Sequence, residues 1–232
     1  MHVPGTCIFG KKYYNRIMGI RKVELSNEQY YHVFNRSIAK YEIFTSDREY
    51  QHFIYSLRYY LAPEAHLKMS RFTELSTKNQ MKILNKRDRN NQPIDIICYC
   101  IMPTHFHLLV KQNKDFGVTN YLRLVQNSYS HYFNLKHKRS GPLWQGKFKN
   151  IQVKSDEQLL HLTRYIHLNP SNSILVDKPE EWLSSSYNEY LNSNEDLCTY
   201  KDIIDIDSSE YQNFVNDRKD YQRQLHLIKS TI

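Results

Sequence analysis

Residues 94–111, IDIICYCIMPTHFHLLVK, decide the fold of this chain. An apolar run over 94–101 is followed, after a short polar break, by a second apolar run over 105–111. Short apolar runs that are separated by a turn signal are typical of adjacent strands. The stretch therefore predicts two neighbouring strands that are joined by a turn at Pro103-Thr104.

The sequence before this pair contains one strand pattern and one helix pattern. Residues 30–34 (YYHVF) are aromatic and β-branched and predict a strand. A helix is predicted from Ser46 to near Pro63, with apolar residues on one side. Residues 64–93 are polar and basic, which indicates an insertion that holds a short helix around 74–86.

The sequence after the pair continues in the same way. We expect a long helix over 117–136, a β-hairpin or strand pair over 143–153 with Gly146 near its bend, and a last helix from Ser155 to about Leu168. Proline disfavours a helical residue before it, so the last helix should stop at Asn169-Pro170. This order of elements predicts an α+β fold in which one antiparallel sheet is covered by helices on one face.

The composition favours a nucleic-acid partner. The chain has 232 residues and a formal net charge of +8, and its 19 tyrosines offer flat rings for stacking on bases. Its pI is about 9.1, which suits a phosphate backbone. No apolar run approaches the roughly 20 residues of a membrane span, and the four cysteines show no disulfide framework. We therefore expect a cytoplasmic protein with no membrane partner.

His105 and His107 form a His-x-His triplet on the second central strand. Side chains alternate between the two faces of a strand, so both imidazoles point to one side and Phe106 points to the other. Two imidazoles on one face can hold one divalent ion. The triplet predicts a metal site, and a pair of surface histidines without a ligand is the alternative.

The last helix places a tyrosine beside two polar residues. Ser155 begins the sequence S-D-E-Q, which has the form of a capping box and predicts the helix start. Tyr165 and Asn169 are four residues apart and share one face, with His161 one turn earlier. Asn169 could be a third, oxygen ligand for a metal, with positions left for a phosphate oxygen. The alternative for Tyr165 is a partly buried helix tyrosine without a function.

Basic and aromatic residues follow the long helix. The candidate DNA contacts are Lys136, Lys138, Arg139, Trp144, Lys147 and Lys149. Positive side chains suit phosphates, and aromatic rings suit base stacking. Trp144 and Phe148 could instead be core residues, and for Phe148 we prefer that interpretation.

The cysteines allow a second kind of metal site. Cys98 and Cys100 could join the histidine pair as zinc ligands. However, Cys-x-Cys lacks the two-residue spacing of a zinc knuckle, and Pro103 intervenes. We expect both cysteines to be core residues.

Five stretches together resemble a known family. They are YHVFNRSIAKYEIF, CIMPTHFHLLVKQ, GPLWQGKFKNIQV, LLHLTRYIHLNP and PEEWLSSSYNEYL, in this order from about Tyr30 to Leu191. They resemble the REP-associated tyrosine transposases, a branch of the insertion-sequence transposases with one catalytic tyrosine. The resemblance implies a ferredoxin-like HUH endonuclease fold. It also implies that His105 and His107 bind the metal, that Tyr165 is the nucleophile and that Asn169 is a metal ligand, with His161 as its rival.

The implied activity is cleavage and rejoining of single-stranded DNA at hairpin-forming sites. Mg²⁺ or Mn²⁺ would be the cofactor, because a free tyrosine has a pKa near 10 and needs a nearby cation to become a phenolate. Attack by Tyr165 would leave a 5′-phosphotyrosine and a free 3′-hydroxyl. The alternative is a non-catalytic DNA- or RNA-binding regulator on the same fold. Related enzymes include monomers and homodimers, so both states stay open.

The resemblance also suggests how the chain is divided. We expect an N-terminal extension over 1–24, a transposase domain over 25–191 that contains the 64–93 insertion, and a C-terminal tail over 192–232. Tyr55 and Tyr59 lie upstream of the histidine pair, as the tyrosines of conjugative relaxases do. Because the other motifs fit transposases better, we interpret Tyr55 and Tyr59 as packing residues of a helix.

Overall fold

The computed structural model describes residues 24–63, 65–88 and 91–217, which fold around a four-stranded sheet. The strands are β1 (Tyr30–Arg36), β2 (Ile94–Met102), β3 (His105–Gln112) and β4 (Lys149–Val153). The α-helices are α2 (Asp47–Tyr59), α3 (Met69–Thr73), α4 (Thr77–Leu84), α5 (Gly117–Lys136), α6 (Asp156–Asn172), α7 (Tyr187–Leu191) and α8 (Ser208–Asn216), and the short 3-10 helices are η1 (Ile38–Lys40) and η2 (Pro179–Glu181). The predicted extension, apart from Glu24, and the last part of the predicted tail lie outside the described residues.

The sheet has the order β2-β3-β1-β4, and each neighbouring pair is antiparallel. Strand β3 lies between β1 and β2, and β1 lies between β3 and β4. Two β-α-β crossovers, one through α2 and one through α5, are therefore interleaved, which is the ferredoxin-like arrangement. The predicted α+β class with an antiparallel sheet is confirmed.

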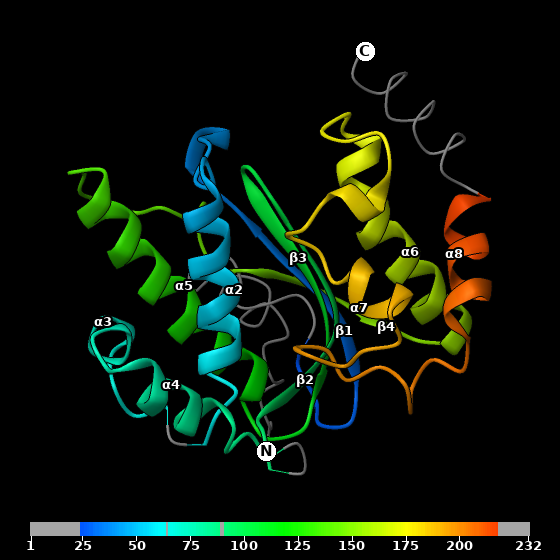
Figure 1. Cartoon of the computed structure of the whole chain (residues 1–232), viewed down its shortest axis with the longest axis horizontal. Coiled ribbons are helices and arrows are strands. Elements are labelled where there is room, and N and C mark those ends of the chain that lie inside the picture. The colour runs from blue at the N-terminus through cyan, green and yellow to red at the C-terminus, as the bar shows by residue number, and fades with distance from the viewer. Residues whose placement is uncertain (1–23, 64, 89–90, 218–232) are drawn as a thin grey trace, which may run out of the picture.

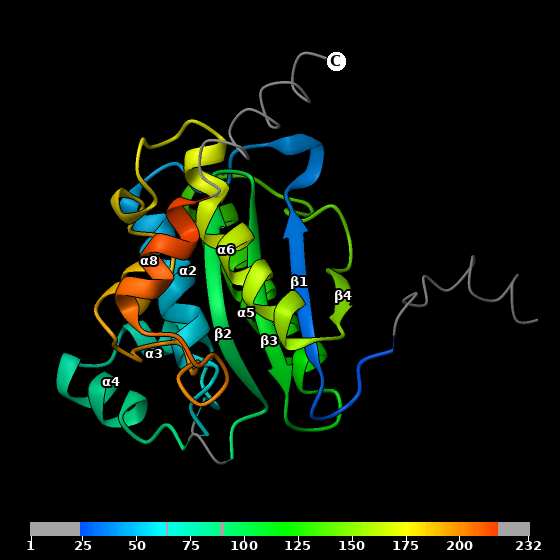
Figure 2. The same cartoon turned by 90° about the vertical axis from the view of Figure 1, so that its right-hand side faces the viewer.

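Helices lie on both faces of this sheet. Helices α2 and α5 cover one face, whereas α6 packs on β2 and β3 from the opposite side (Figure 1). Seen from the side of α6, strands β1 and β4 lie beside this helix rather than behind it (Figure 2). The prediction of helices on one face holds for α2 and α5 but is wrong for α6, which lies on the other face. An amphipathic helix has an apolar stripe to bury, and the second face of the sheet provides a surface for that of α6.

Aromatic side chains fill the core between the sheet and the crossover helices. Phe53 of α2 and Phe106 of β3 are fully buried, with ring centroids 5.3 Å apart. Tyr129 of α5 lies edge-on to Phe53 at 5.2 Å, and its hydroxyl donates a hydrogen bond to the carbonyl of Ile43. A buried hydroxyl needs such a partner, so Tyr129 is a core residue, as its place in the helical stripe predicts.

Helix α6 begins at the predicted residue. The hydroxyl oxygen of Ser155 accepts a hydrogen bond from the backbone N–H of Gln158 at 3.1 Å. The side-chain oxygen of Gln158 in turn accepts from the backbone N–H of Lys154 at 2.8 Å. Two backbone donors at the helix start are thus satisfied by side chains.

The end of α6 differs from the prediction, because the helix continues through Pro170 to Asn172. Pro170 has no N–H to donate to the carbonyl of Ile166 one turn earlier. The side-chain Nδ2 of Asn169 donates to this carbonyl instead, at 3.3 Å. A local side-chain donor therefore replaces the missing backbone bond and lets the helix pass the proline.

The segment 143–153 contains one strand instead of the predicted hairpin. Its strand β4 pairs with β1, while Trp144 forms an isolated bridge with Ser37. Gly146 lies between them with a φ of 139°, a conformation that favours glycine. The pairing partner is far away in the chain, so a local strand pattern could not reveal it.

The 64–93 insertion forms a small core of its own against α2. It contains two short helices instead of the single one predicted, and the buried cluster consists of Tyr59, Met69, Phe72 and Leu84. The hydroxyl of Tyr59 donates to the carbonyl of Leu67 at 2.9 Å, and that of Tyr55 donates to Gln80 at 2.6 Å. The interpretation of Tyr55 and Tyr59 as packing residues is confirmed.

Residues after 191 are part of the main fold as far as the structure describes them. The main core includes Leu197, Cys198, Tyr200, Ile204, Tyr211 and Val215. The predicted boundary at 191 is therefore too early for residues 192–217. Among the residues described, no helix is both long and apolar enough to cross a membrane.

Candidate active site

His105 and His107 project from β3 toward the face that carries α6. Their cross-strand neighbours on β1 are Arg36 and Phe34, respectively. The centroids of the two imidazole rings are 5.0 Å apart, and Phe106 between them is buried in the core on the other face. The geometry is that of the predicted same-face pair.

Each imidazole is oriented through its Nδ1 atom. In His105 this atom lies 2.9 Å from the hydroxyl oxygen of Thr104, and in His107 it lies 2.8 Å from Nε2 of His32. Burial, with a smaller contribution from Arg36, lowers the pKa of His105 to about 4, and burial lowers the pKa of His107 well below its usual value. Both rings are therefore neutral at pH 7, the form that binds metals.

His32 is a third histidine at the site, and the sequence analysis did not assign it a role. It lies on β1 with its ring centroid 5.0 Å from that of His107 and 6.1 Å from that of Tyr165. Strand alternation puts His32 and Phe34 on one face, which is a signal in the sequence. The sequence alone does not show which residues of β1 and β3 lie opposite each other, because this register depends on the packing of distant segments.

Helix α6 holds Tyr165 above the histidines. Its ring lies edge-on to His107 with centroids 5.9 Å apart, and 41% of the residue is exposed. The phenol thus borders both the histidine pair and solvent, where a substrate can reach it. Burial raises the pKa of Tyr165, so the hydroxyl is protonated at neutral pH and an adjacent cation would favour its ionisation.

The two candidates for a third metal ligand differ in their contacts. The side-chain nitrogen of Asn169 donates to the carbonyl of Tyr165 at 2.9 Å, which leaves the amide oxygen as its ligating atom. His161 contacts a guanidinium nitrogen of Arg164 at 2.6 Å, and its ring lies 5.5 Å from that of Phe214 on α8. These contacts favour Asn169 over His161, and its role as a ligand stays a prediction.

Cations flank the histidine pair on β1 and β4. Arg36 is exposed opposite His105, and Lys149 is exposed opposite Phe34. The half-buried ring of Phe34 lies 5.8 Å from that of His107. Charge and an aromatic surface therefore adjoin the pair, as a nucleotide strand requires. Lys149 is one of the DNA contacts predicted from the sequence, whereas Arg36 is not, because its place beside His105 follows from the strand register.

Three further candidate DNA contacts lie on the surface. Lys138 and Lys147 are exposed, and the guanidinium of Arg139 lies 6.0 Å from the ring centroid of the exposed Tyr41. These positions are compatible with phosphate contacts, which stay predictions.

Two candidate DNA contacts have other roles in the structure. The ammonium of Lys136 lies 2.8 Å from a carboxylate oxygen of Glu49, whose side chain is completely buried. Trp144 is 8% exposed, and its Nε1 donates to the carbonyl of Gln126 at 3.2 Å. We correct both assignments: Lys136 neutralises a buried charge, and Trp144 is a core residue. The prediction that Phe148 is a core residue is confirmed.

The cysteines are buried thiols. Cys98 and Cys100 are free and completely buried in the main core, as predicted. Within the described part of the chain, no group of three His, Cys, Asp or Glu residues is arranged to hold a metal.

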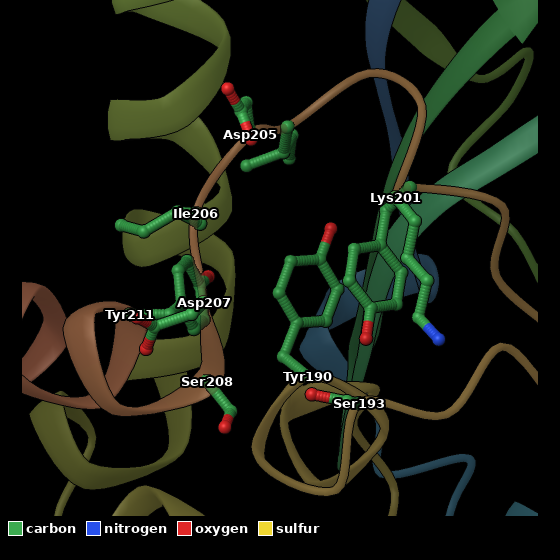
Figure 3. A pocket seen from close by; sticks show the side chains of 10 residues that line it. Tyr190, Ser193, Lys201, Asp205, Ile206, Asp207, Ser208 and Tyr211 are labelled. Carbon is green, nitrogen blue, oxygen red and sulfur yellow. The ribbon is translucent and has the colours of Figure 1, made fainter.

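A surface pocket lies at a separate place, where the chain leads from α7 to α8 (Figure 3). Its lining includes the stacked rings of Tyr190 and Tyr200, 3.8 Å apart, together with Lys201, Asp205 and Asp207. It shares no residue with the histidine site, and its mixed charge does not match a phosphate backbone.

Fold and site define an α+β protein whose ferredoxin-like sheet carries a histidine pair next to a tyrosine from a helix. Residues 26–169 match the family of IS200-like transposases, and the chain belongs to this family of DNA-cleaving and strand-transferring enzymes. The resemblance seen in the sequence is thereby confirmed.

Two relatives illustrate this membership. Over 119 residues the chain is 24% identical to a protein of Haemophilus influenzae that is named as a REP-associated tyrosine transposase, and the match covers 47% of this chain and 68% of that protein. The fold is similar to that of a REP-associated tyrosine transposase bound to a REP hairpin, with a TM-score of 0.53, 13% identity, and coverage of 82% of this chain and 95% of that one.

Proposed function

We propose that this transposase cuts and rejoins single-stranded DNA at hairpin-forming sites, with Tyr165 as the nucleophile. The observation that carries the proposal is the position of the Tyr165 ring, 5.9 Å from that of His107 and open to solvent on its other side. The exposed cations Arg36 and Lys149 beside the pair suit the phosphates of a strand. The hairpin preference is supported by the solved relative, which is bound to a REP hairpin.

The residues present fit a divalent ion such as Mg²⁺ or Mn²⁺. His105 and His107 are neutral, and because their Nδ1 atoms are occupied by Thr104 and His32, Nε2 is the nitrogen of each ring that is available to a metal. Asn169 would add an amide oxygen, a hard donor that such ions accept. When bound, the ion would neutralise the non-bridging oxygens of the scissile phosphate and orient it.

The covalent step takes place on Tyr165. Its phenolic oxygen attacks the phosphorus atom while the phenolic proton passes to solvent. The bond from phosphorus to the 3′ oxygen breaks, and that oxygen takes up a proton and leaves as a hydroxyl. The 5′ phosphate stays joined to Tyr165 as a phosphodiester, so attack by a 3′-hydroxyl reverses the step without ATP.

The test combines the purified chain with labelled single-stranded DNA that carries a hairpin, in Mn²⁺ or in EDTA. We expect a covalent adduct in Mn²⁺ alone, and peptide mapping by mass spectrometry should place the DNA on Tyr165. A blunt duplex of the same sequence is the control and should give little adduct. Cleavage in EDTA, or attachment to another tyrosine, would contradict the proposal, and hairpin binding without any adduct would indicate a regulator.

A further inference from the structure

A buried histidine contacts the metal-binding pair from the neighbouring strand. Nε2 of His32 on β1 lies 2.8 Å from Nδ1 of His107 on β3. Both residues are 7% exposed, so water competes little for this hydrogen bond. The contact is not part of either strand ladder, and the covalent step above does not use it.

The direction of this hydrogen bond decides whether His107 can bind a metal. A neutral imidazole carries one proton, on either Nδ1 or Nε2. If Nδ1 of His107 donates to His32, then Nε2 of His107 has a free lone pair. If His32 donates instead, the proton of His107 must be on Nε2, and that nitrogen cannot ligate. The partner at Nδ1 thus determines the ligating atom.

Other contacts fix the ring of His32 at this position. Its centroid lies 4.9 Å from that of Phe34 on the same strand and 6.1 Å from that of Tyr165 on α6. The backbone of β1 is paired on both sides, with Leu109 of β3 and Ile151 of β4 opposite His32. The acceptor is therefore held in place before any ligand arrives, which is what positioning a metal ligand requires.

We propose that His32 is a positioning residue of the metal site, which accepts a hydrogen bond from Nδ1–H of His107 and so directs Nε2 of His107 to the metal. The inference rests on the proposed function, because it assumes that His107 is a ligand. It assigns His32 no contact with metal or DNA. The residue acts through His107 alone.

The first test reads the proton positions directly in the metal-free, full-length protein. Long-range ¹H–¹⁵N NMR spectra of ¹⁵N-histidine-labelled protein distinguish the two neutral tautomers of each ring. We expect both His32 and His107 as Nδ1–H tautomers, since His32 must keep Nε2 free to accept. A His107 with its proton on Nε2 would overturn the proposal without any need for a variant.

The second test measures Mn²⁺ affinity without DNA, by calorimetry and by the electron paramagnetic resonance signal of free Mn²⁺. His32→Leu removes the acceptor and should weaken binding by about 10- to 100-fold. His32→Gln places a side-chain oxygen near the former Nε2 position and should restore affinity to within about threefold of the original value. His52→Gln is the matched control, because His52 is half-buried and stacks on Tyr132 at 3.7 Å on the crossover-helix side, away from the histidine pair.

The outcomes separate this inference from the proposed function. If His107→Ala abolishes Mn²⁺ binding and His32→Leu leaves it unchanged, the metal site stands and the role of His32 is wrong. If His32→Gln abolishes binding as completely as His107→Ala does, His32 is itself a ligand and the positioning role is wrong. If the unaltered protein binds no Mn²⁺, both the metal part of the proposed function and this inference are wrong.

Discussion

At the scale of single residues, Tyr165 differs from the other tyrosines in what its ring faces. Most tyrosines of the core direct their hydroxyls to backbone carbonyls, as Tyr121 and Tyr190 do with Leu57 and Ile97. Tyr165 instead lies half exposed beside His107, and its pKa is raised by burial alone. A bound metal ion next to the hydroxyl would favour its ionisation.

Replacement of Tyr165 by Phe removes the hydroxyl of the proposed nucleophile without removing the ring. We expect Tyr165→Phe to abolish the covalent adduct, to keep hairpin affinity within about threefold and to change the free energy of unfolding by less than about 0.5 kcal/mol. Gel analysis of the adduct, binding titrations and thermal unfolding check the three parts. The control is Tyr132→Phe on α5, which should form adduct normally; an adduct in Tyr165→Phe would disprove the assignment.

Lys149 and Lys136 are a matched pair of lysines with different expected roles. Lys149→Gln should weaken single-strand binding and reduce the slope of log affinity against log salt by about 0.7, because one phosphate contact is lost. Lys136→Gln should leave this slope unchanged and instead destabilise the fold by roughly 1–2 kcal/mol, because buried Glu49 loses a partner. Salt titrations and denaturant unfolding distinguish the two, and equal salt slopes for both variants would contradict the assignment.

At the scale of elements, a buried carboxylate ties the start of α2 to the end of α5. Glu49 in the first turn of α2 accepts from Lys136 at 2.8 Å and from His137 at 2.6 Å, at the C-terminal end of α5. The negative charge of Glu49 at a helix start and the positive charge of Lys136 at a helix end also suit the two helix dipoles. These partners, with the backbone and hydroxyl of Thr45, outweigh burial and lower the pKa of Glu49 to about 2.

This ion pair predicts a specific loss of stability in acid. The pKa of Glu49 falls from 4.5 to about 2 on folding, so the contribution is complete above pH 4.5 and is lost as the pH falls toward 2. Glu49→Gln should therefore destabilise the protein by roughly 3 kcal/mol at pH 7 and by almost nothing near pH 2. Urea unfolding across this range measures the difference.

The control for this prediction is Glu42→Gln, an exposed carboxylate just before α2. It should change the free energy of unfolding by less than about 0.5 kcal/mol at every pH. A Glu49→Gln variant whose destabilisation stays constant between pH 7 and pH 3 would show that packing, and not charge, explains the effect.

At the scale of the whole molecule, residues after 191 help to hold the helix that carries the proposed nucleophile, Tyr165. Nδ1 of His167 on α6 lies 2.7 Å from the hydroxyl of Tyr211 on α8, and its Nε2 lies 2.8 Å from the hydroxyl of Ser186. Burial lowers the pKa of His167 to about 3, so the ring is neutral and both contacts are hydrogen bonds without charge. The position of α6 thus depends on segments at both of its sides.

Loss of the Tyr211 hydroxyl should therefore affect the entire fold. Tyr211→Phe leaves one nitrogen of His167 without a partner in the core, which should cost about 1–2 kcal/mol and lower the Tm by about 3–6 °C. Tyr41→Phe, at a residue that is 54% exposed, is the control and should leave the Tm unchanged. A single unfolding transition in differential scanning calorimetry would show that α8 unfolds with the sheet, whereas an early separate transition would contradict its place in the core.

Elements were more predictable than contacts between them. Strands β2 and β3 and helix α5 lie where local periodicity predicts, because alternation and helical spacing depend on neighbouring residues. The prediction of a hairpin or strand pair over 143–153 was wrong because β4 pairs with β1. The predicted end of α6 was wrong because Asn169 replaces a bond that Pro170 cannot make. In both cases a contact with one particular strand or side chain outweighed the preference of the local sequence.

The sequence by itself determined the α+β class with an antiparallel sheet and the same-face pair His105 and His107. Its resemblance to a family implied the ferredoxin-like arrangement and the choice of Tyr165 as the nucleophile, which stays a prediction. Tertiary structure alone decided that His32 and Arg36 adjoin the pair, and that the segment 192–217 contributes side chains to the main core. It also showed that Trp144 is a core residue and that the ammonium of Lys136 pairs with buried Glu49. The physical reason is that periodicity shows which face a side chain takes, whereas strand register and burial depend on the packing of distant segments.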